Sequence, residues 1–71
     1  MRIPQVDREL CDVLLWRDGE ETYWMLTSTG WVFRVLEGRL ADFIRTFPPE
    51  LRMCIENDET GQVVQILPVA H

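Results

Sequence analysis

The chain has 71 residues, 46% of them hydrophobic, and it carries a net charge of −5. This length excludes a second domain of ordinary size, so we expect a single domain over residues 1–71, and the apolar content excludes a disordered chain. The acidic balance argues against direct binding to a nucleic-acid backbone, which needs clustered cations, and against adsorption to an anionic membrane.

The first apolar segment runs from Cys11 to Trp16 and predicts a β-strand. Apolar residues between Val6 and Leu14 also recur at helical spacing, so a short N-terminal helix over residues 6–16 stays open as the alternative. The dipeptide Asp18-Gly19 follows, and it is typical of the tight turn of a hairpin.

Two more apolar segments, 22–27 and 31–36, are rich in aromatic and β-branched residues. Between them lies Ser28-Thr29-Gly30, where glycine allows the positive φ of a hairpin loop. The three segments together predict a three-stranded antiparallel meander.

The spacing then changes from strand to helix. Leu40, Phe43, Ile44 and Phe47 fall at i, i+3, i+4 and i+7, which predicts a helix between Gly38 and Phe47. Pro48-Pro49 ends this helix, because the residue before a proline avoids the α region.

The last part of the chain predicts a second hairpin, with strands at 51–56 and 62–67 and a turn from Asn57 to Gly61. The sequence Pro-Pro-Glu-Leu-Arg also suits the first turn of a helix, so a helix over 49–56 stays open. The predicted fold class is therefore α+β, a small antiparallel sheet of order β-β-β-α-β-β with one helix packed on it.

Both faces of this sheet are apolar in the predicted strands. The segment 31–36 alternates Trp31, Phe33 and Val35 with Val32, Arg34 and Leu36. One short helix covers one face, so the other is either closed by residues 1–10 or left as an aromatic surface for a partner.

The order of the strands also predicts that the turns gather charge at one end of the sheet. Seven acidic residues are expected there, with Arg17 and Arg39 as the nearby counter-charges: Asp18, Glu20, Glu21, Glu37, Glu56, Asp58 and Glu59. A concentrated negative end attracts a basic cleft on another protein.

Residues for catalysis and metal binding are scarce. The only histidine is the terminal His71, and Cys11 and Cys54 are isolated in the sequence. We therefore expect no enzyme activity, no catalytic residue, no metal site and no cofactor. The two cysteines are expected as buried thiols, with a disulfide between them left open.

These features predict a non-enzymatic protein-binding module, a small acidic inhibitor or regulator that docks on a larger basic protein, for example one that binds nucleic acid. Phage-type anti-defence proteins share this size and charge. The alternatives are a self-associating homodimeric module and a small-ligand-binding domain. The candidate partner-binding residues are Trp16, Asp18, Glu20, Glu21, Trp24, Arg34, Glu37, Glu56, Asp58 and Glu59. Neither a secretory signal nor a membrane-spanning run is recognised, so the predicted compartment is cytoplasmic.

Overall fold

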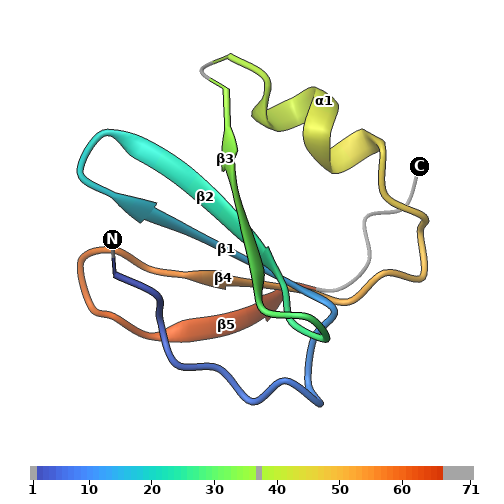
Figure 1. Ribbon diagram of the computed structural model, residues 1–71, viewed down its shortest axis with the longest axis horizontal. Coiled ribbons are helices and arrows are strands. Elements are labelled where there is room, and N and C mark those ends of the chain that lie inside the picture. The colour runs from blue at the N-terminus through green and yellow to red at the C-terminus, as the bar shows by residue number, and fades with distance from the viewer. Residues whose placement is uncertain (1, 37, 67–71) are drawn as a thin grey trace.

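The computed structural model describes residues 2–36 and 38–66, which form a five-stranded sheet and one short helix (Figure 1). In chain order the elements are β1 (Val13–Asp18), β2 (Glu21–Leu26), β3 (Trp31–Val35), α1 (Leu40–Arg45), β4 (Met53–Glu56) and β5 (Val63–Ile66). The broad α+β class is confirmed, and the strand predicted at 51–56 is observed as β4, so the alternative helix over 49–56 is not formed. Among the described residues, no helix has the length and apolar character needed to cross a membrane.

The sheet is mixed, so the prediction of an antiparallel sheet was wrong. Its strand order is β3-β2-β1-β4-β5, and β1 pairs antiparallel with β2 but parallel with β4. The reason lies in the connection between β3 and β4. The chain leaves β3 at the end where β1 also finishes, and the segment carrying α1 returns it to the opposite end before β4 begins.

Strand β1 is the centre of the molecule. Val13, Leu14, Leu15 and Trp16 are successive residues that alternate between the two faces of the sheet, and none is more than 3% exposed. An uninterrupted apolar run of this kind suits a strand that has neighbours on both edges and cover on both faces.

One face of the sheet, the helix face, is covered by α1. The helix is held there by an aromatic cluster in which Trp24 stacks on Phe33 at 4.6 Å between ring centroids and meets Phe43 at 4.9 Å. The helix is shorter than the predicted 38–47. Its N-cap residue Arg39 makes no side-chain capping bond and no residue of the helix is buried, so its ends gain little from capping or packing.

The opposite face is covered by residues 2–12, most of which run extended along it, so the N-terminal helix left open as an alternative over residues 6–16 is not formed (Figure 1). The only backbone bond within this segment that resembles a helical turn joins the Leu10 amide to the Asp7 carbonyl at 3.0 Å. An extended chain spans about 3.3 Å per residue against 1.5 Å in a helix, so these few residues reach across the face. Val6 packs on the core cluster of Cys11, Leu14, Trp16, Met25 and Cys54.

Two turns fix the sheet at one end. Gly19 has a φ of +65° at the first position of the two-residue turn between β1 and β2, which is the requirement of a type II′ hairpin. In the turn between β4 and β5, the Asn57 side-chain oxygen accepts the Glu59 amide at 2.9 Å. Because β1 and β4 are parallel, both turns lie at the same end.

The central strand generates the first prediction. Leu14→Ala removes a fully buried side chain from the core cluster, so we expect a loss of about 2–5 kcal/mol in the free energy of unfolding, measured by urea denaturation. Leu10→Ala is the matched control, because Leu10 is 55% exposed and its truncation should change stability by less than about 0.5 kcal/mol. Equal losses in the two variants would contradict the central position of β1.

A charged pair joins the starts of β1 and β4. The Asp12 carboxylate accepts three bonds from Arg52: from its backbone amide at 3.0 Å, from Nε at 3.3 Å and from Nη2 at 3.1 Å. These bonds, the side-chain ones first, lower the pKa of Asp12 below its ordinary value.

Asp12→Asn therefore tests a pH-dependent contribution to stability. A lowered pKa in the folded state stabilises the fold above the unfolded value of about 3.9, and this contribution is lost as pH falls through the folded value. We expect the variant to be less stable than the parent at pH 7 and the difference to shrink toward pH 2, measured by urea denaturation across pH. Glu50→Gln, which removes an exposed carboxylate outside any described ion pair, should show a smaller difference.

Candidate functional site

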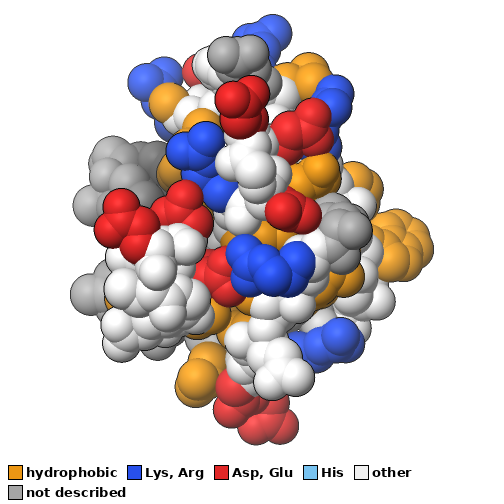
Figure 2. All heavy atoms as spheres, turned by 90° about the vertical axis from the view of Figure 1, so that its left-hand side faces the viewer, with side chains coloured by type: hydrophobic (Ala, Val, Ile, Leu, Met, Phe, Trp, Pro, Cys, Tyr) orange, Lys and Arg blue, Asp and Glu red, His pale blue; other side chains and the backbone are white. Residues whose placement is uncertain are grey.

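The two turns make one end of the sheet polar, and we call residues 17–21 and 56–61 the turn end. Figure 2 faces the side on which these turns lie, and it shows acidic and basic side chains interspersed, with apolar side chains between them. The predicted gathering of charge at one end thus follows from the parallel pairing of β1 and β4. Glu37 is outside the described residues.

Part of this negative charge is neutralised within the chain. Glu56 is only 7% exposed, and its two carboxylate oxygens accept bonds of 2.6 and 2.8 Å from the Arg2 guanidinium. Glu21 accepts a bond of 3.2 Å from Arg34 and another from the Tyr23 hydroxyl. The principal counter-charges are therefore Arg2 and Arg34, where the sequence predicted Arg17 and Arg39.

Three of the four remaining acids of the turn end are open to solvent. Glu20, Asp58 and Glu59 are exposed, and none forms an ion pair with a described residue. Asp18 accepts the Arg2 backbone amide at 3.2 Å. The turn end holds six carboxylates. Three guanidiniums lie in it or form ion pairs with it, namely those of Arg2, Arg17 and Arg34, so three negative charges are left in excess.

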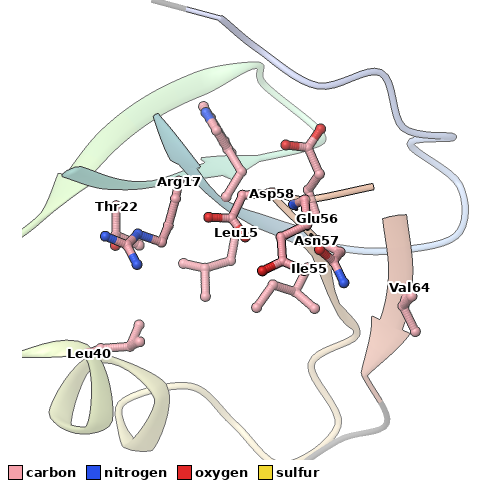
Figure 3. A pocket seen from close by; sticks show the side chains of 11 residues that line it. Leu15, Arg17, Thr22, Leu40, Ile55, Glu56, Asn57, Asp58 and Val64 are labelled. Atoms are coloured by element: carbon pink, nitrogen blue, oxygen red, sulfur yellow. Dashed lines mark hydrogen bonds between the residues drawn. The ribbon is translucent and has the colours of Figure 1, made fainter. Parts of the chain in front are cut away.

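An apolar hollow of about 510 Å³ lies beside the turn end, between α1 and the sheet. Figure 3 shows Leu40 of α1 facing Leu15 and Ile55 across it, with Val64 of β5 at the side. Asn57, Asp58 and Glu59 contribute to its rim. Ile55 and Val64 are 36% and 49% exposed, so the hollow presents apolar surface to solvent.

The hollow exists because α1 covers the helix face unevenly. Its aromatic contacts lie over β2 and β3, through Trp24 and Phe33, and Leu40 in its first turn extends toward β1. Among the described residues, α1 is the one helix, and it leaves Ile55 and Val64 36% and 49% exposed. Within the described residues, the hollow is therefore an apolar surface next to carboxylates that form no ion pair.

The candidate residues from the sequence fall into different environments. Trp16 lies in the core at 1% exposure, and Trp24 is half-buried in the aromatic cluster. Arg34 is exposed on β3 and pairs with Glu21. Asp58 and Glu59 lie at the rim of the hollow, as does the buried Glu56.

The apolar lining of the hollow was missed from the sequence. The alternation of side chains places Leu15 and Ile55 on faces of their own strands, but only the parallel register that pairs Leu15 with Ile55 puts them on the same face of one sheet. Arg2 was missed because no local pattern connects it with Glu56, which is 54 positions away.

Neither a metal site nor a relative assigns a function. Within the described ranges, no three His, Cys, Asp or Glu side chains are grouped closely enough to hold a metal ion. No family model, no curated protein and no solved structure matches the chain.

The two cysteines are free and buried, as predicted. Burial, followed by a hydrogen bond with the Cys54 side chain, raises the pKa of Cys11 to about 12. Cys11 therefore lies in the core as a neutral thiol, and its contribution to stability falls as pH rises from the unfolded value of about 8.5 toward the folded value of about 12.

This environment predicts slow alkylation of both thiols. In the native protein at pH 8, iodoacetamide should label Cys11 and Cys54 at least tenfold more slowly than in urea, because the thiolate is the nucleophile and both side chains are enclosed. Mass spectrometry of timed samples measures the labelling. A Leu10→Cys variant supplies an exposed thiol as the internal control, and equal rates at all three positions would contradict the buried pair.

Proposed function

We propose that this protein is a non-enzymatic binding module for a basic protein segment. In this proposal an apolar side chain of the partner enters the hollow, and a neighbouring Arg or Lys pairs with Asp58 or Glu59. The observation that carries it is the apolar hollow whose rim holds carboxylates outside any described ion pair.

The apolar part of this contact supplies most of the affinity. Burying one Leu, Ile or Met side chain contributes about 1.5–3 kcal/mol, and the partly exposed Leu40, Ile55 and Val64 would lose solvent contact together with it. The exposed carboxylates add less, about 0.2–1 kcal/mol for each pair, but they select a cation and speed association.

The same chemistry supports an inhibitor or regulator that docks on a larger basic protein. The excess negative charge of the turn end is placed beside the apolar contact, so a basic cleft is attracted toward the surface that would then be buried. A small-ligand site is the weaker alternative, because the lining residues Ile55 and Val64 are partly exposed, so a bound ligand would keep much of its own surface in contact with solvent.

Panning a random peptide library against the immobilised chain tests this function. We expect enriched peptides in which a large apolar residue lies within a few positions of Arg or Lys, and we expect Val64→Glu to weaken their binding at least tenfold by placing a charge in the hollow. The double variant Asp58→Lys/Glu59→Lys should weaken it roughly tenfold and reduce its salt dependence.

Leu10→Glu is the matched control, because it adds the same charge at an apolar side chain of similar exposure outside the hollow. Circular dichroism verifies the fold of each variant. Peptides that bind Val64→Glu as tightly as the parent, or that lack basic residues, would refute the proposed function.

A further inference from the structure

The sheet ends at β3, and this edge is unusually open. No described strand pairs with the outer side of β3 (Figure 1). Of its side chains only Val35 is buried, while Trp31 is 65% exposed and Phe33 is 39% exposed. Natural edge strands are commonly protected by proline, lysine or an inward-pointing charge, and β3 has only Arg34.

The hydrogen-bonding direction of β3 follows from its neighbours. The Thr27 amide donates to the Asp12 carbonyl at 3.1 Å, so the backbone groups of Thr27 face β1. Because this direction alternates along a strand, the backbone groups of Met25 and Tyr23 also face β1. The residues between them face β3. In the register of β2 with β3, this leaves the backbone groups of Val32 and Arg34 directed outward.

We propose that β3 pairs antiparallel with β3 of a second copy of the chain, about a two-fold axis at Phe33. Val32 of one copy then lies opposite Arg34 of the other, and the outward amides and carbonyls of both residues bond across the edge. Phe33 meets its symmetry mate at a non-hydrogen-bonded position, where side chains approach most closely. Trp31 lies opposite Val35 on the same face.

Charge favours the antiparallel orientation of the second copy over the parallel one. Each copy carries a net charge of −5, and antiparallel pairing directs the two turn ends away from each other. The last residues of the two β3 strands are then offset by about 13 Å along the strand direction, which exceeds the Debye length of about 8 Å at physiological salt. A parallel arrangement would bring the two acidic ends together.

Sedimentation equilibrium between about 10 μM and 1 mM tests the dimer, because an edge contact of this size is expected to be weak. We expect a concentration-dependent approach to twice the 8.4 kDa monomer mass. Trp31→Lys should weaken dimerisation at least tenfold, while Leu10→Lys, at a similarly exposed apolar residue, should leave it unchanged.

Val32→Pro is a second, backbone-directed variant. It removes an amide that faces outward, so it should abolish dimerisation while leaving the ladder between β2 and β3 in place, with circular dichroism reporting the fold. A monomer at 1 mM, or a dimer that persists in both Trp31→Lys and Val32→Pro, would overturn the proposal.

The register has its own test in Phe33→Cys. A non-hydrogen-bonded antiparallel pair holds its Cα atoms about 4.5 Å apart, within the range of a disulfide. Oxidised glutathione should link two copies through position 33, each bond taking two electrons and two protons from two thiols and releasing two reduced glutathiones. Linkage no faster than in Leu10→Cys would refute this register.

Trp31 is not part of the hollow, so failure of the dimer leaves peptide binding there unaffected.

Discussion

The structure depends on one constraint, which is the burial of the first four residues of β1 between β2 and β4. Four successive apolar side chains in this strand point alternately to the two faces of the sheet, so other parts of the 71-residue chain must cover both faces. The helix supplies one cover and the extended residues 2–12 supply the other. The small size of the protein makes both covers thin, because little chain remains once five strands are formed.

The parallel pairing of β1 with β4 determines where the chemistry gathers. Parallel strands finish at the same edge, so the turns that follow β1 and β4 lie together although 38 positions separate Asp18 from Glu56. The same pairing places Leu15 and Ile55 side by side as the floor of the hollow. Within the turn end, Arg2 neutralises the one carboxylate that is buried, whereas Glu20, Asp58 and Glu59 are exposed and form no described ion pair. This division suits a structural role for Glu56 and a binding role for Asp58 and Glu59.

Local patterns were sufficient to predict the strands, and they failed where cover or pairing came from distant parts of the chain. Asp18-Gly19 and the apolar alternation after it identify the first hairpin, and the i, i+3, i+4 spacing identifies α1. The N-terminal segment stayed open between helix and strand because helical spacing at Val6 and Leu10 competes with an extended path that covers more of the sheet. The mixed sheet was missed because hydrophobic patterning is the same for a parallel and an antiparallel neighbour. The hollow needed both the register of β1 with β4 and the short reach of α1, neither of which is local information.

The two surfaces that we propose as binding sites arise from the same shortage of cover, but they are separate in space. The aromatic cluster around Trp24 holds α1 over β2 and β3, so no described element covers the surface over Ile55 and Val64, and no described strand pairs with the outer edge of β3. The β3 edge offers backbone groups and aromatic side chains with one charge, a combination suited to a strand of like sequence. The hollow offers apolar side chains beside free carboxylates, a combination suited to a basic partner. A dimer formed through β3 would carry two such hollows facing away from the shared edge, so pairing of two copies and capture of a partner are compatible, and a partner with two basic segments would gain avidity from the pair.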